Sequence, residues 1–205
     1  MTKEKGCTLL SILYVLMAYA SPFIWLSTAT KKVGGMTKES FLILAIPFIM
    51  GIIIAIYLKA ERQKISRVTL LRCSIIVKYM LIPLYIAGGL LIALFVLLAL
   101  TPLVIMTFIA PVVAGALGIY GYATMLGGDA FSLAYISKAG EEGVHGKVLC
   151  TVGRILQFFF VGDVVSTAVL ALKEKKYIAL TIAVMAIMVI GFVGAAVCLV
   201  IKIFS

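Results

Sequence analysis

The side chain with the most chemistry to offer in this sequence is an aspartate inside an apolar run. Asp163 lies in the run 158–165, about 24 Å along the same apolar segment from Lys147 at 1.5 Å per helical residue. An ionised aspartate near the centre of a membrane helix costs about 2.5–3.5 kcal/mol, so such residues usually face a bundle interior or a water-filled cavity. Ser166 and Thr167 follow at i+3 and i+4, on the same helix face and within reach of the carboxyl. These three residues are the candidate site for substrate binding or ion coupling.

Two interpretations of Asp163 stay open. In the first, burial keeps the carboxyl protonated, and it hydrogen-bonds a neighbouring helix and holds the bundle together. In the second, it couples transport to a proton or a cation. The sequence alone does not separate them.

Three further polar residues lie in apolar segments: Lys78, Arg154 and Gln157. Nine residues separate Arg154 from Asp163, which is about 900° around one continuous helix, so the two would point to opposite faces. Arg154 is about two turns from the end of its segment and is expected to snorkel to the lipid headgroups. The alternative is a pocket for an anion or a lipid headgroup, which Arg154 would share with Lys78 and Gln157 if their helices touch.

His145 and Cys150 are the residues that could serve an intramembrane cysteine peptidase, with the imidazole as base. Their spacing of five residues places them about 140° apart on a helix, and no third residue is placed to orient the imidazole. The sequence also has no P-loop, HExxH or GxSxG motif, no paired carboxylates and no CxxC. We therefore expect no catalytic residues, no metal and no cofactor, and a role other than that of an enzyme.

The composition indicates which kind of fold holds these polar residues. The chain is 64% apolar and 13% charged, whereas soluble domains are roughly 45–50% apolar and about 25% charged. A chain of 205 residues with this composition is expected to be an all-α, polytopic transmembrane bundle. The net charge of +10 is attributed to loops beside anionic lipid rather than to nucleic acid binding.

A transmembrane helix needs about 20 mostly apolar residues, and the chain holds enough for about six spans in a single transmembrane domain, 1–205. Thr101-Pro102 divides one apolar run of two span lengths, and the connection after the fourth span begins at Gly127-Gly128. A continuation of the fourth helix through Ala130–Ile136 is the alternative for the first part of this connection. The predicted spans are 9–29, 41–58, 73–100, 103–126, 147–172 and 178–203.

Six spans place both termini on one side of the membrane. Leaving out Lys78, that side holds 11 Lys and Arg residues, and the other side holds six: Lys31, Lys32, Lys38, Lys173, Lys175 and Lys176. The positive-inside rule then predicts a multi-pass protein of the plasma membrane with both termini in the cytoplasm. Cys7, Cys73, Cys150 and Cys198 would lie near the cytoplasmic side as reduced thiols, whereas the inverted orientation would make a disulfide plausible.

Two segments carry a resemblance to other proteins: Lys78 with Ile82–Tyr85, and Leu156–Ser166. Through them the stretch from about Leu71 to Lys176 resembles an uncharacterised family of small bacterial multi-pass membrane proteins. The dipeptide Gly127-Gly128 departs from the family's pattern, which bears on the connection between the fourth and fifth spans. The resemblance implies no activity.

The function expected first is that of a transporter, or of a membrane subunit of a transport system, because the predicted size is similar to that of membrane components that work with separate ATPases. The alternative is a non-catalytic binding or immunity-type protein that docks a partner within the membrane. An intramembrane cysteine peptidase is the second alternative. The expected partners are the lipid bilayer and either a second copy of the chain or another membrane subunit, with no nucleic acid.

Overall fold

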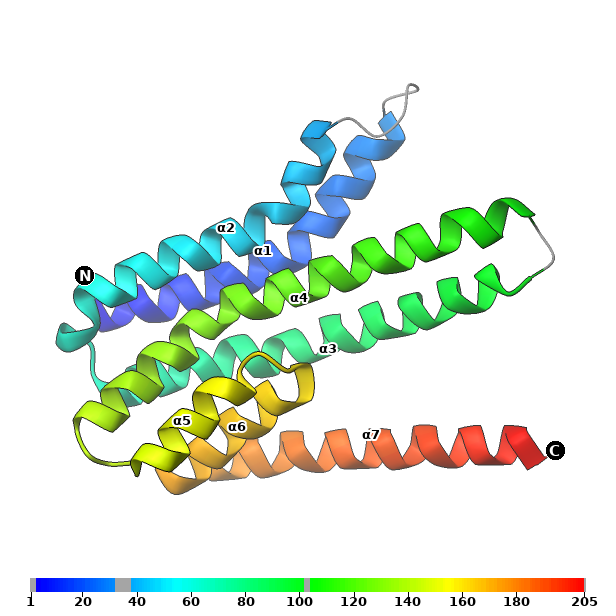
Figure 1. The fold of residues 1–205 in the computed structure, drawn as a ribbon. Helices are drawn as coiled ribbons and strands as arrows, with labels where there is room; N and C mark the ends of the chain where they lie inside the picture. Colours follow the sequence, from blue (N-terminus) through cyan, green and yellow to red (C-terminus); the bar gives the residue numbers. More distant parts are fainter. Residues whose placement is uncertain (1–2, 32–37, 102–103, 205) are drawn as a thin grey trace.

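A computed structural model describes residues 3–31, 38–101 and 104–204 of the chain, and every regular element in these ranges is helical (Figure 1). In chain order the elements are α1 (Lys3–Lys31), α2 (Lys38–Glu61), a short 3₁₀ helix η1 (Arg62–Lys64), α3 (Arg67–Ala99), α4 (Val104–Glu141), α5 (Lys147–Leu156), α6 (Phe160–Lys173) and α7 (Ile178–Phe204).

Four helices, α1 to α4, are long and apolar enough to cross a membrane. The protein is therefore all-α, with four helices that suit a lipid bilayer, and the first three predicted spans fall within α1, α2 and α3. The larger count of six spans is not confirmed. The last predicted span, 178–203, coincides with the helix α7.

The prediction of one continuous span over 147–172 is not confirmed. The chain forms two short helices there, α5 with 10 residues and α6 with 14. At 1.5 Å per residue they extend about 15 and about 21 Å, less than the bilayer core of about 30 Å. They fold back on each other in one half of the bundle, so the segment begins and ends at the same end (Figure 1). We call α5, the turn 157–159 and α6 the hairpin.

The predicted end of the fourth span at residue 126 is wrong, because α4 continues to Glu141. Gly127 and Gly128, expected in a loop, lie inside this helix. A Cβ atom built on Gly51 of α2 would lie 2.2 Å from the Gly127 Cα, and one built on Gly127 would lie 2.5 Å from the Tyr14 hydroxyl oxygen. The glycines are therefore needed for close approach of α1 and α2 to α4.

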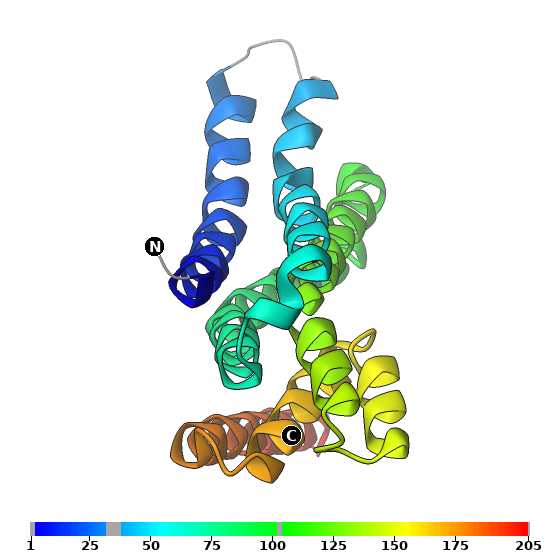
Figure 2. The same ribbon diagram turned by 90° about the vertical axis from the view of Figure 1, so that its left-hand side faces the viewer.

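The helices are arranged in three layers (Figure 2). The helix pair α1 and α2 lies on one side, α3 and α4 lie in the middle, and α5, α6 and α7 lie on the other side. α1 and α2 both bend away from the bundle (Figure 1), and each has a proline inside it, Pro22 and Pro47.

Three of the connections between helices meet at one end of the bundle, which we call the charged end. It comprises the first turn of α1 and the connections 61–66, 142–146 and 174–177. The two ends of the chain lie at opposite ends of the bundle (Figure 1). This differs from the arrangement of a six-span chain, in which both would lie at the same end.

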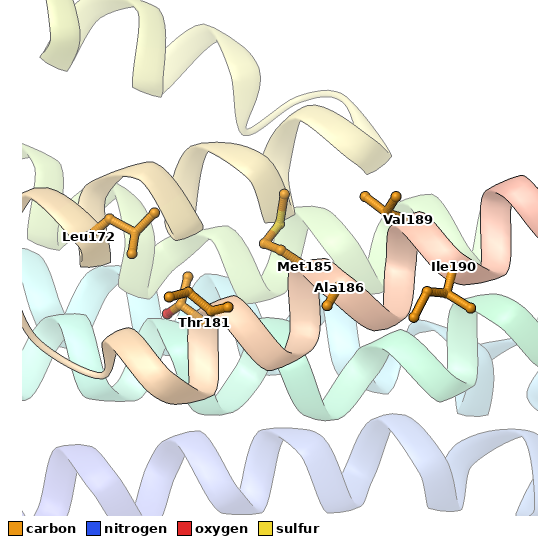
Figure 3. Close-up of a pocket in the computed structure, with 7 residues that line it drawn as sticks. Leu172, Thr181, Met185, Ala186, Val189 and Ile190 are labelled. Carbon is orange, nitrogen blue, oxygen red and sulfur yellow. The ribbon is translucent and has the colours of Figure 1, made fainter.

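α7 is anchored near its start, where the Tyr79 hydroxyl of α3 donates to Thr181 Oγ1 at 3.1 Å. Further along, a groove of about 490 Å³ separates it from α6, with Leu172 on one side and Met185 and Val189 on the other (Figure 3). The groove is lined by apolar side chains apart from Thr181. The side chain of Cys198, on the second half of α7, lies outside the described residues.

Candidate functional site

A buried lysine shared by two aspartates forms the centre of the molecule. The Lys78 Nζ atom pairs with Asp163 Oδ1 at 2.5 Å and also with Asp129 Oδ1. The three side chains are at most 3% exposed. They come from α3, α4 and α6, so the ion triad joins the two middle helices to the hairpin. Asp129 and Asp163 are also the only aspartates in the chain.

The hairpin places Asp163 in the first turn of α6. Its backbone N–H donates to the Phe159 carbonyl oxygen at 2.7 Å, which closes that first turn. A carboxylate at a helix N-terminus is favoured by the partial positive charge of the helix dipole. The break in the hairpin therefore both turns the chain and provides a suitable place for an anionic side chain.

Gln157, in the turn of the hairpin, completes the site and is fully buried. With its amide nitrogen facing the carboxylates, it donates to Asp163 Oδ1 at 2.6 Å and lies 3.2 Å from Asp129 Oδ1. Its amide oxygen then accepts from Ser166 Oγ at 3.2 Å. The same amide nitrogen lies 3.2 Å from Ser132 Oγ, which is 2.6 Å from Ser74 Oγ. Together the Gln157 amide and the hydroxyls of Ser74, Ser132 and Ser166 form a hydrogen-bonding network beside the triad.

The site keeps unused hydrogen-bonding capacity. Within the described part of the chain, Asp129 Oδ2, Asp163 Oδ2, Thr167 Oγ1 and the Tyr85 hydroxyl are buried and have no hydrogen-bond partner. A buried polar atom without a partner is costly. These four atoms could therefore receive a proton, a cation or a small polar ligand.

An aromatic cluster lies at the tip of the hairpin. Phe160 packs edge-on against Tyr85 of α3, with ring centroids 5.5 Å apart, and against Tyr122 of α4 at 6.1 Å. Phe158 and Phe159, beside it, are 50% and 60% exposed. The tip is thus apolar on its outer side, as expected for a hairpin surrounded by lipid.

The structure gives different partners to two residues for which the sequence offered a shared anion pocket. Lys78 pairs with the aspartates, whereas Arg154 is exposed on α5 and its Nη2 atom lies 3.4 Å from Ser137 Oγ. The interpretation of Lys78 and Arg154 as one pocket is wrong, because the carboxylates neutralise the lysine. The argument that Arg154 and Asp163 lie on opposite faces of one helix does not apply either, since they belong to two helices.

Ser166 and Thr167 are buried beside Asp163, as expected, but no hydrogen bond joins either hydroxyl to that carboxyl. Ser166 is linked to the aspartate through Gln157. The residue that reaches Asp163 Oδ1 is therefore the glutamine, which the sequence interpretation had assigned to an anion contact. Its role changes because the turn of the hairpin brings residues 157 and 163 together.

Asp129 was missed by the sequence analysis. It follows Gly127-Gly128, a pair typical of loops, and was assigned to a polar connection. Its place inside α4 follows from packing: the glycines contact Tyr14, Val77 and the backbone of α2, so the helix continues past them. The available signal was the apolar stretch 130–136, which continues the helical pattern beyond the aspartate.

His145 and Cys150 do not form a nucleophile and base pair. The Cys150 thiol lies 3.8 Å from the His145 carbonyl oxygen, while the imidazole Nε2 lies 2.8 Å from the Tyr135 hydroxyl. Burial lowers the pKa of His145, partly opposed by the nearby Glu174 carboxylate. This geometry does not support the cysteine peptidase interpretation.

A second ion network closes the charged end. Arg67 Nε pairs with Glu174 Oε1 at 2.6 Å, and the same arginine pairs with Glu142. The Tyr135 hydroxyl donates to Glu174 Oε1 at 3.0 Å. Lys138 donates to backbone carbonyl oxygens of the connection after α2, among them Gln63 O at 3.2 Å. These contacts tie together three of the connections at this end.

A family of unknown function (DUF6652) matches residues 6–176, and the chain belongs to this family. The predicted resemblance to an uncharacterised family is thereby confirmed, over a longer stretch than expected. The match includes the whole ion triad and the hairpin and ends before α7. Neither the curated proteins nor the solved structures contain a match.

Proposed function

We propose that this protein is a membrane transport protein in which the Lys78–Asp129–Asp163 triad binds a proton or a monovalent cation and couples its passage to transport. The observation that carries the proposal is that two buried carboxylates, on different elements, share one lysine. Intramembrane ionisable residues of this kind typically mark proton or ion pathways.

The charge of the triad indicates its ligand. One ammonium and two ionised carboxylates leave one negative charge in a region where an uncompensated charge is costly. One proton or one monovalent cation makes the site neutral. The two Oδ2 atoms without partners are the atoms at which such a ligand would bind.

The hairpin is the element that would respond to binding. Asp163 and Gln157 both belong to it, whereas Lys78 and Asp129 belong to the long helices α3 and α4. Protonation of Asp163 would weaken its pairing with Lys78 and release the hairpin from the bundle. Broken helices are a recurring feature of transporter binding sites, because the irregular backbone lines the site.

The test is charge displacement on a solid-supported membrane carrying proteoliposomes, after jumps in H⁺, Na⁺ or K⁺ concentration. We expect a current that depends on one of these ions, with a loss of at least about tenfold in Asp163→Asn and Asp129→Asn. Glu142→Gln, which removes an exposed carboxylate at the charged end, is the matched control and should keep the current.

A wild-type protein that gives no current above protein-free liposomes, or an Asp163→Asn variant with the full current, contradicts the proposal. In that case a stable stoichiometric complex with another membrane protein, recovered equally with Asp163→Asn, would identify the binding or immunity-type alternative.

A further inference from the structure

Two cysteines from different helices meet near the charged end. Cys7 of α1 and Cys73 of α3 are both fully buried, and their Sγ atoms lie 3.3 Å apart. The residues are 66 positions apart in sequence, so the contact is a product of the fold. Cys150, the other cysteine with a described side chain, has a carbonyl oxygen rather than a thiol as its neighbour.

The two sulfur atoms are in direct non-bonded contact. A disulfide has an S–S length of about 2.05 Å, so the two sulfur atoms must approach by about 1.3 Å. Because α1 and α3 pack against each other, this approach requires a local adjustment rather than a rearrangement of the fold.

A groove lies at the surface beside the pair, although both cysteines are themselves buried. It has a volume of about 500 Å³, and its lining includes Thr8, Thr69 and Arg72. Thr8 and Arg72 are the sequence neighbours of the two cysteines, and Cys73 Sγ lies 4.0 Å from Thr8 Oγ1. The Arg72 guanidinium favours a thiolate nearby, which is the reactive form of cysteine.

We propose that Cys7 and Cys73 are a redox-sensitive dithiol that forms a reversible disulfide between α1 and α3 on exposure to hydrogen peroxide. The Cys73 thiolate attacks one peroxide oxygen, the O–O bond breaks, and water leaves with the thiol proton, which gives a sulfenic acid. The Cys7 thiol then attacks Cys73 Sγ, the S–O bond breaks, and a second water leaves as the S–S bond forms. The two thiols lose two electrons, which reduce the peroxide to two water molecules.

The disulfide would fix the first turns of α1 and α3 to each other. On α3, Ser74 is the next residue after Cys73, and Lys78 follows about one turn later. The disulfide would therefore hold the segment of α3 that carries these two site residues in place. The proposal concerns the modification itself and does not depend on the transport function.

The experiment uses the full-length protein in native membranes, treated with hydrogen peroxide or with dithiothreitol. The protein is then denatured, its free thiols are labelled with a maleimide-polyethylene glycol, and the labels are counted by gel shift. The chain has four cysteines, so we expect four labels after reduction and two after peroxide, with dithiothreitol restoring four. Peptide mapping by mass spectrometry should show Cys7 joined to Cys73.

Two variants sharpen the result. Cys150→Ser, the matched control, should still lose two labels with peroxide, whereas Cys7→Ala should form no cross-linked peptide. Four labels on the wild-type protein after peroxide, or a mapped disulfide between other cysteines, overturns the proposal. The peptide map of the wild-type protein decides the question even if a variant fails to fold.

Discussion

At the scale of single residues, the charge balance of the site depends on Lys78. Its ammonium is the cation that pairs with both buried aspartates, and its side chain is 1% exposed. Gln157 adds a hydrogen-bond donor to the same two carboxylates but no charge. The lysine is therefore expected to be needed for folding.

We predict that Lys78→Met strongly destabilises the protein, because it leaves two carboxylates facing each other in the interior. Removing one partner of a buried ion pair typically costs about 3–5 kcal/mol. Thermal unfolding in detergent should show a clear drop in Tm, and Lys64→Met, at an exposed ion pair with Glu61, should not.

The charge argument can be separated from a simple loss of packing. A triple variant with Lys78→Met, Asp129→Asn and Asp163→Asn carries no charge in the site and should recover most of the lost Tm. A triple variant as unstable as Lys78→Met alone would show that the lysine stem, rather than its charge, stabilises the fold.

Single residues also show how far the sequence could predict the site. Asp163 and Lys78 were identifiable because a charge inside an apolar run is unusual whatever the fold. The pairing of Lys78 with Asp163, and the participation of Asp129, could not be identified from the sequence, because both depend on which helices are in contact. Asp129 in particular follows two glycines whose role in packing is visible only when α1 and α2 are in place.

At the scale of elements, the contact between α2 and α4 depends on glycine. The backbones of Gly51 and Gly127 are so close that a Cβ on the former would overlap the latter. Close backbone contacts of this kind support packing of helices in lipid, where the hydrophobic effect between helices is absent.

We predict that Gly51→Ala separates α2 from α4 and lowers the Tm in detergent. The added Cβ would meet backbone atoms 2.2–2.8 Å away, which cannot move as a side chain could. Gly88→Ala, also inside a long helix, is the matched control: its Cβ meets nothing within 4 Å, so the Tm should stay the same or rise slightly. Equal effects of the two substitutions would show that α2 and α4 do not pack through this contact.

The hairpin is the element that the sequence did not reveal. Residues 147–172 have the length and composition of a span, and no proline lies among them. The break falls at residues 157–159, where Gln157 finds its partners on Asp129 and Asp163. A glutamine satisfied by the rest of the bundle stabilises a turn that local sequence rules cannot anticipate.

At the scale of the whole molecule, the hairpin changes the distribution of charge. Because α6 returns to the charged end, Lys173, Lys175 and Lys176 join it. In the described residues that end holds 12 Lys and Arg residues, against three at the other end: Lys31, Lys38 and Lys202. The 12 are Lys3, Lys5, Lys59, Arg62, Lys64, Arg67, Arg72, Lys138, Lys147, Lys173, Lys175 and Lys176. Lys78 and Arg154, which lie between the ends, are left out of both counts.

This asymmetry, stronger than the one expected for six spans, predicts that the charged end faces the cytoplasm. With α7 crossing the bilayer, the chain then ends on the opposite side, and the connection 174–177 lies in the cytoplasm. In a six-span chain the C-terminal end would instead lie in the cytoplasm, and the connection 174–177 would lie on the opposite side. Cysteines introduced at Lys175 and after residue 205, labelled in intact cells with a membrane-impermeant maleimide, distinguish the two topologies.

We expect label on the added C-terminal cysteine, and on the Lys175→Cys variant only after the cells are permeabilised. The unmodified protein is the control for background, because its cysteines with described side chains are buried. Label on Lys175→Cys but not on the C-terminal cysteine in intact cells would mean that residues 147–172 cross the membrane. The hairpin would then not exist in the bilayer, and Gln157 and Asp163 would lie apart on one continuous helix, on faces about 120° apart at 100° per residue. The topology therefore decides whether the closed triad with its glutamine exists in the membrane, and with it the basis for ion coupling.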